Sequence, residues 1–425
     1  MKLAFTLGTA LATMWLVSVA AGMAPETSRE LGVTGRINAN PAVAASGRFA
    51  VVAWGATPAD GPTDIYLATS RDAGATFTAA VRVNDDQSPA SLSGEQPPAI
   101  ALVPRRGSDP EIVVVWTSKG GDGTRLLSAR SRDGGKTFTH AAVVPGTDAV
   151  GNRGWESVTA EPDGRVVALW LDHRGQAMGG AGHAHMSHQP GAHAEAPADG
   201  VARAQLSKVF FGPVGAAGAR SIAAGVCYCC KTALAAGADG TIYAAWRHVY
   251  AGNLRDIAFA ASRDGGRTFS DPLRVSEDHW ELDGCPENGP AIALDTASHV
   301  HIVWPTLVTE SGHETLALFH AVSRDDRTFS SRERIPTSGA AFHPQMAFSR
   351  GSGLLIAWDE TGSGGHRVHF ARAAIGTDAP AFAAVTPPGD SRGAYPAIAA
   401  TDAGALAAWA TPAETGSQIQ VVQIR

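Results

Sequence analysis

The chain has 425 residues, of which 44% are hydrophobic and 17% charged, and it contains 48 glycines and 25 prolines. This balance is typical of a globular protein and excludes a disordered chain. The formal net charge is −6 and no lysine or arginine run occurs, so we expect no nucleic-acid partner. Abundant glycine and proline favour many short strands joined by tight turns.

The N-terminus has the features of an export signal. Lys2 precedes an apolar stretch over residues 3–19, and small residues up to Ala24 offer a cleavage site. We therefore predict a signal peptide over residues 1–24. No later segment is apolar enough to span a bilayer, so the mature protein is expected in a bacterial periplasm or secreted.

One sequence pattern then recurs: a Pro-Ala-Ile-Ala-like strand, a short turn, and an apolar strand that ends in tryptophan. The seven closing residues are Trp54, Trp116, Trp170, Trp246, Trp304, Trp358 and Trp409. Two further strands follow each of the earlier tryptophans, as at residues 64–68 and 81–83. Four short strands per repeat are typical of a propeller blade. We predict an all-β fold, a single seven-bladed β-propeller over residues 25–425.

The turn before the fourth strand carries its own motif. It reads Ser-Arg-Asp-x-Gly-x-Thr-Phe at residues 70–77, 131–138 and 262–269, with a copy one residue shorter at 323–329. In such a turn Ser and Asp side chains bond nearby amides, glycine takes a positive φ, and the ring packs between strands. These copies resemble the Asp-box, or BNR repeat, of the sialidase superfamily. The resemblance implies a propeller, and because sialidases have six blades, a six-bladed ring is the alternative.

The last repeat is short of one strand. Only residues 419–422 follow Trp409 as a strand, so its outer strand must come from elsewhere. Residues 32–37, just before the first repeat, can supply it. We therefore expect an N-terminal strand to close the ring and remove its open edge.

A sialidase-like glycoside hydrolase is one possible function. The resemblance implies an arginine triad, a Tyr–Glu pair and an Asp acid/base, but the early Arg-Ile-Pro signature is absent and no catalytic residue is carried over. Side chains that could still form such a site on one face are Tyr395, Arg153, Arg174, Arg247, Arg392, Glu156, Asp172 and Asp283. A guanidinium fork matches a carboxylate, so acidic sugars would be the substrates.

One face of the ring collects the unusual residues. In an up-and-down blade the turns after the second and fourth strands share a face, and the Asp-boxes lie on the other. That rule places all four cysteines on the first face: Cys227, Cys229, Cys230 and Cys285. A segment inserted at about residues 176–200 falls on the same face and contains Met178, His183, His185, Met186, His188 and His193. Imidazole with thioether suits copper, whereas zinc gains little from methionine.

The cysteines allow two interpretations. An exported protein with an even cysteine count usually forms disulfides, and a staple from Cys285 to the cluster would join neighbouring repeats. Alternatively, the thiolates bind Cu(I) beside the His/Met segment.

Our leading hypothesis is a monomeric copper-binding propeller for delivery, sequestration or resistance, with a periplasmic metal donor or acceptor protein as partner. A protein-interaction platform stabilised by disulfides is a third possibility.

Overall fold

The computed structural model describes residues 28–177, 199–282, 284, 286–310, 312–362, 364–374, 380–413 and 416–424. The predicted signal peptide lies outside these residues. Within the described ranges, no helix is long and apolar enough to cross a membrane. Two short helices, α1 (Arg174–Ala177) and α2 (Asp199–Leu206), flank residues 178–198.

Five of the sheets contain four strands each, paired antiparallel in chain order. The first is β6 (Ala99–Val103), β7 (Glu111–Gly120), β8 (Gly123–Ser131) and β9 (Ala142–Val143), and the second is β10 (Arg153–Ala160), β11 (Val166–Asp172), β12 (Lys208–Pro213) and β13 (Arg220–Ala224). The third is β14 (Ala233–Ala236), β15 (Ile242–Arg247), β16 (Ile257–Ser262) and β17 (Leu273–Arg274). The fourth is β18 (Ala291–Leu294), β19 (Val300–Glu310), β20 (His313–Ser323) and β21 (Glu333–Arg334), and the fifth is β22 (Ala340–Ser349), β23 (Gly353–Gly362), β24 (Gly365–Ala373) and β25 (Ala383–Val385).

The remaining sheet has eight strands and joins the two ends of the chain. One half is β2 (Arg36–Ser46), β3 (Phe49–Pro58), β4 (Asp64–Ser70) and β5 (Val81–Arg82). The other half is β26 (Ala394–Thr401), β27 (Gly404–Pro412), β28 (Ser417–Ile424) and β1 (Ser28–Leu31). The halves meet at a parallel pair between Ile37 and Ser417. An N-terminal strand therefore completes the last repeat, as predicted.

The strand that does so is not the one expected. β1 pairs antiparallel with β28 from Ser28–Val422 to Leu31–Ile419, so the outer strand precedes residues 32–37. Those residues instead form a turn, in which Arg36 N donates to Val33 O and Gly35 has a φ of 76°. Ile37 already belongs to the inner strand β2. The turn is needed because the chain must pass from the outer edge of the last repeat to the inner edge of the first.

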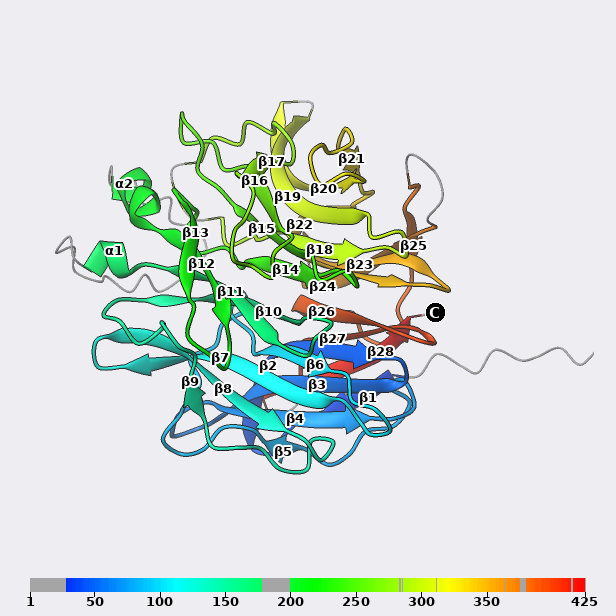
Figure 1. Cartoon of the computed structure of the whole chain (residues 1–425). Helices are drawn as coiled ribbons and strands as arrows, with labels where there is room; N and C mark the ends of the chain where they lie inside the picture. The colour runs from blue at the N-terminus through cyan, green and yellow to red at the C-terminus, as the bar shows by residue number, and fades with distance from the viewer. Residues whose placement is uncertain are drawn as a thin grey trace, which may run out of the picture.

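The repeats pack side by side around a closed ring, which makes the fold a β-propeller. Every repeat tryptophan lies in the second strand of its four-strand group and is at most 2% exposed. Each hydrophobic cluster between sheets combines residues of two successive groups, and one cluster joins the last group to the first. Figure 1 shows the sheets following one another from blue to red, with β28 beside β2 and β3.

The Asp-box-like turns have the predicted local chemistry. In the first copy Ser70 Oγ donates to Asp72 Oδ1 at 2.7 Å, and Gly74 N donates to Ser70 Oγ at 2.8 Å. Hydrogen bonds from Thr76 and Ser70 outweigh the effect of burial and lower the pKa of Asp72 to about 2. These turns connect the third and fourth strands of their groups and are structural.

Candidate metal centre

The first strands of the repeats surround the axis of the ring. In order β2, β6, β10, β14, β18, β22 and β26, each contacts the next, and β26 contacts β2. Residues from all of these strands, or from the loops just before them, line a cavity of about 210 Å³. We call it the axial cavity. Because the loops before the first strands meet at its end, residues far apart in sequence come together there.

Four of the first strands contain a β-bulge near their N-terminal end. Register shifts occur at the bulges that contain Asn40, Trp155, His343 and Tyr395, and each of these residues has a φ between 50° and 55°. Such a conformation is unfavourable for a residue other than glycine and is concentrated at functional sites. The bulges thus mark this end of the axial cavity as the candidate functional end.

Asp359 holds two of these bulges in place. Its Oδ1 lies 2.8 Å from His343 Nδ1 and accepts a hydrogen bond from Tyr395 N at 3.0 Å. The His343 and Tyr395 rings stack with 3.7 Å between centroids. Burial acts to raise the pKa of Asp359, but the hydrogen bonds with His343 and His366 outweigh it and hold this pKa below the usual value.

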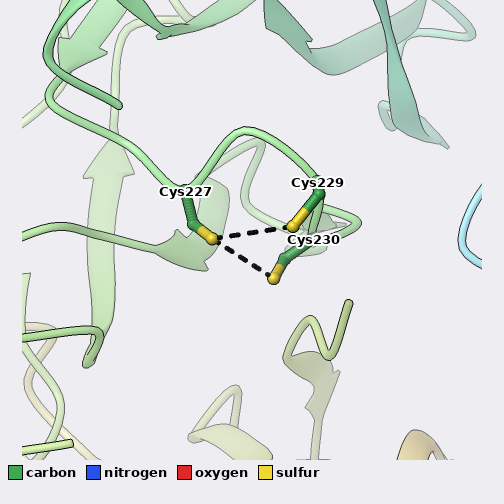
Figure 2. Close-up of side chains that lie close together, drawn as sticks. All are labelled: Cys227, Cys229 and Cys230. Carbon is green, nitrogen blue, oxygen red and sulfur yellow. Dashed lines mark hydrogen bonds between the residues drawn. The ribbon is translucent and has the colours of Figure 1, made fainter. Parts of the chain in front are cut away.

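Three cysteine sulfurs lie together in the loop before β14. Cys227 Sγ is 3.6 Å from Cys230 Sγ and 3.9 Å from Cys229 Sγ, and Figure 2 shows the three side chains pointing toward one another. Their exposed fractions are 1%, 5% and 1% for Cys227, Cys229 and Cys230. Among the described residues, they are the one group of three or more candidate ligands close enough to hold a metal ion. We call these residues the cysteine cluster.

The sulfurs differ in bonding state. Cys227 and Cys230 are free thiols, whereas Cys229 is disulfide-bonded. Cys285, which would pair with the cluster in the disulfide interpretation of the sequence, lies outside the described residues. The thiol and disulfide interpretations of the sequence therefore apply to different members of one cluster.

Two buried arginines give the cluster a positive environment. Arg255 and Arg247 are at most 1% exposed, and Arg255 Nη1 lies 3.7 Å from Cys227 Sγ. The hydrogen bond from Cys230, together with the charges of Arg255 and Arg247, outweighs burial and lowers the pKa of Cys227 to about 7. Burial raises the pKa of Cys230 well above its ordinary value. The pair therefore contains one readily formed thiolate and one thiol.

Glu95 anchors the loop that carries the cluster. It belongs to the loop before β6 and is 3% exposed, yet its Oε2 accepts hydrogen bonds from Lys231 N at 3.0 Å and Gly289 N at 3.2 Å. The other end of the cluster loop is held by Cys227 N, which donates to Arg247 O at 3.0 Å. One carboxylate thus ties three loops together at the end of the axial cavity.

The His/Met residues predicted as ligands lie outside the described residues: Met178, His183, His185, Met186, His188 and His193. Helix α2, at the C-terminal end of that segment, lies beside the cysteine cluster. Ala204 of α2 packs in the same buried cluster as the three cysteines, and Gln176 Nε2 of α1 donates to Ser207 Oγ at 2.8 Å. The predicted segment of residues 176–200 is therefore attached next to the cysteines, and its first and last residues are helical.

The arginines considered for a glycosidase site are already engaged. Arg153 donates to Asp172 and to the carbonyl oxygens of residues 124, 147 and 150, while Arg247 donates to those of 255, 288 and 305. Arg174 pairs with Asp172, and the exposed Arg392 pairs with Asp390. Asp283 lies outside the described residues. None of these four guanidinium groups faces the axial cavity without a protein partner in the described structure.

Glu156 and Tyr395, two residues considered for a glycosidase site, line the axial cavity. Glu156 accepts a hydrogen bond from Thr117 Oγ1 at 3.0 Å, and burial raises its pKa to about 7. Burial also raises the pKa of Tyr395. Lys231 lines the same cavity, and burial lowers its pKa.

Two features of the candidate site were not predicted from the sequence. The spacing of Cys227 and Cys230 is Cys-x-x-C, a signal that would have identified them as the thiol pair. Glu95 had no comparable signal, because its partners are 136 and 194 residues away.

Comparisons with known proteins support the fold. No protein-family model and no curated protein matches the chain. Among solved structures, an α-L-arabinofuranosidase of Fusarium graminearum in complex with arabinobiose is 12% identical, with a TM-score of 0.54, over 94% of this chain and 97% of its own.

Two further structures are similar over comparable lengths. The α-L-arabinanase of Penicillium chrysogenum is 12% identical, with a TM-score of 0.52 and coverage of 93% of this chain and 98% of its own. An ulvan lyase is 11% identical, with a TM-score of 0.54 and coverage of 92% and 95%. At these identities the similarity shows that this chain has the propeller-type fold of such enzymes, and the fold alone.

Proposed function

We propose that this propeller binds a soft metal ion, copper as Cu(I), through the cysteine cluster at the end of the axial cavity. The observation that carries the proposal is the grouping of three buried sulfurs within 4.8 Å of one another. Thiolates are soft ligands and bind Cu(I) as well as zinc and iron–sulfur clusters. Cys227 and Cys230, the two free thiols, are the primary ligands.

The charge around the cluster favours a monovalent ion. Arg255 and Arg247 place two buried positive charges near Cys227. In a weakly screened interior, each added positive charge on the bound ion is disfavoured by these guanidinium groups. Zn²⁺ carries twice the charge of Cu(I), so the same thiolates bind Cu(I) with less repulsion. The protein would then deliver or sequester copper, or confer copper resistance, outside the cytoplasm.

Metal analysis tests this proposal directly. The protein purified after growth with added copper is expected to contain Cu(I), and the apo-protein is expected to take up one tightly bound Cu(I) in titrations against a chromogenic chelator. The Cys227→Ser/Cys230→Ser variant should lose this ion. Met346→Leu is the matched control, because it removes a sulfur that lines the axial cavity outside the cluster. The proposal would be overturned if the cysteine variant kept its copper, or if the wild-type protein took up no Cu(I).

The His/Met segment is proposed to capture the ion before it reaches the cysteines. Helix α2, at its C-terminal end, packs beside the cluster, and imidazole and thioether side chains suit copper. Alanine replacement of its histidines is expected to slow copper loading and to leave the tightly bound ion in place. The residues concerned are His183, His185, His188 and His193. An unchanged loading rate would remove this segment from the proposal.

A second candidate function is hydrolysis or lysis of a carbohydrate. Glu156 favours it, because its pKa of about 7 suits a general acid at neutral pH and it lines the axial cavity with Tyr395. The similar structures include enzymes named for arabinan and ulvan. The test is release of product from arabinan, ulvan and aryl sialosides, with Glu156→Gln as the inactive variant. Equal rates for wild type and Glu156→Gln would exclude this role.

A further inference from the structure

The distances between the sulfurs indicate which metal coordination geometry the cluster fits. With metal–sulfur bonds of about 2.3 Å, two ligands on opposite sides of an ion lie about 4.6 Å apart, and three in one plane lie about 4.0 Å apart. The observed separations are 3.6 Å for Cys227–Cys230 and 3.9 Å for Cys227–Cys229. They match a three-sulfur shell better than a linear pair.

The third sulfur of that shell is not a thiol. Cys229 is disulfide-bonded, whereas Cys227 and Cys230 are free. A disulfide sulfur is a much poorer metal ligand than a thiolate, because the thiolate is the form that binds. While Cys229 is disulfide-bonded, the cluster therefore offers two strong ligands, although the distances between its sulfurs fit a site with three.

We infer that the Cys229 disulfide is a redox gate on the metal site and that its reduction supplies the third thiolate ligand. This inference rests on the proposed copper function. An external dithiol gives two electrons and two protons to the disulfide, so that Cys229 and its partner cysteine become thiols and the dithiol becomes a cyclic disulfide. The Cys229 thiol then releases its proton to the solvent and binds, as a thiolate, the Cu(I) held by Cys227 and Cys230.

The cluster loop is held in shape by contacts other than the disulfide. Val226 N donates to Ala204 O at 3.2 Å, and Cys227 N donates to Arg247 O at 3.0 Å. After the cluster, Lys231 N donates to Glu95 Oε2 and Thr232 N to the Trp155 carbonyl oxygen. Because hydrogen bonds fix both ends of the loop, reduction is expected to leave the Cys229 sulfur near its present position.

The test compares two forms of the full-length mature protein. One is purified without reductant. The other is treated with dithiothreitol and freed of it under anaerobic conditions. Alkylation in denaturant followed by mass spectrometry gives the state of each cysteine, and Cys229 should be alkylated only in the reduced form. Cu(I) affinity is then measured by chelator competition, and the number of bound sulfurs by X-ray absorption.

We expect two sulfurs per Cu(I) in the untreated form and three in the reduced form, with at least tenfold tighter binding after reduction. The Cys229→Ser variant should show two sulfurs and no response to dithiothreitol. Equal affinity and equal sulfur counts in both wild-type forms would overturn the gate while leaving the copper site intact. Absence of Cu(I) binding in both forms would overturn the metal site itself, and the gate with it.

Discussion

Replacement of Glu95 tests whether this side chain positions the cysteine cluster in addition to stabilising the fold. Its Oε2 accepts backbone hydrogen bonds from Lys231, directly after the cluster, and from Gly289. With leucine at this position both buried N–H groups lose their acceptor, at about 1–3 kcal/mol each, or about 2–6 kcal/mol in total. Glutamine keeps one carbonyl oxygen, so we expect Glu95→Gln to lower the free energy of unfolding by about 1–2 kcal/mol.

The same variant is expected to weaken copper binding. Because the neutral amide holds this end of the cluster loop more weakly than the carboxylate does, fewer molecules keep Cys230 Sγ at its 3.6 Å separation from Cys227 Sγ. A ligand set that must be ordered on binding loses affinity by the cost of that ordering. We therefore expect Cu(I) affinity to fall at least tenfold in Glu95→Gln, measured by chelator competition, with urea unfolding as the stability assay.

Glu360 provides the matched control. It is also a buried glutamate, 5% exposed, and its Oε2 accepts backbone hydrogen bonds from Ser338 at 3.0 Å and Gly339 at 2.9 Å. Neither partner lies in the cysteine cluster, so Glu360→Gln should lower stability by a similar amount and leave Cu(I) affinity unchanged. If the two variants lose copper affinity equally, or if Glu95→Gln keeps the wild-type value, Glu95 does not position the cluster.

Three further predictions concern the scaffold. Burial lowers the pKa of His320 to about 3, below its unfolded value of about 6.5. The free energy of unfolding therefore keeps its full value above pH 6.5 and falls by about 1.4 kcal/mol per pH unit between pH 6.5 and the folded pKa. Urea unfolding should show a weaker acid dependence in His320→Gln. Asn38→Ala should cost about 2–4 kcal/mol, because this side chain hydrogen-bonds Val33, Trp54 and Ser417 across the ring closure, and an unchanged unfolding midpoint would contradict this. Gly266→Ala should destabilise far more than Gly240→Ala: both have positive φ, but only at Gly266 would a Cβ meet a ring, that of Phe211 at 2.1 Å.

The fold could be predicted from sequence because its information is local and repeated. Each tryptophan ends a short apolar run, and all of them are buried in second strands. The sequence predicted that an N-terminal strand closes the ring, but it did not identify which residues form that strand. Residues 28–31 have no pattern that distinguishes them from 32–37, and the choice depends on the turn at Gly35.

The candidate site was predictable only in part. Placing successive turns on alternate ends of the ring brought the cysteines and the ends of the His/Met segment to one place, which the packing of Ala204 against the cysteine cluster supports. The division into two thiols and one disulfide-bonded cysteine depends on side-chain directions within a tight loop. Glu95 depends on contacts across the axis, and no local pattern encodes those.

The structure separates the residues that stabilise the ring from those that could act chemically. Apolar clusters between neighbouring sheets stabilise the ring. The first strands β2, β10, β22 and β26 carry the bulges at Asn40, Trp155, His343 and Tyr395, whose unfavourable backbone conformations the surrounding sheets must offset. Because the loop before β14 carries the cysteine cluster, the metal site that we propose lies outside the strands of the ring. The residues that we propose to act chemically therefore lie in a loop, the one that carries Cys227, Cys229 and Cys230.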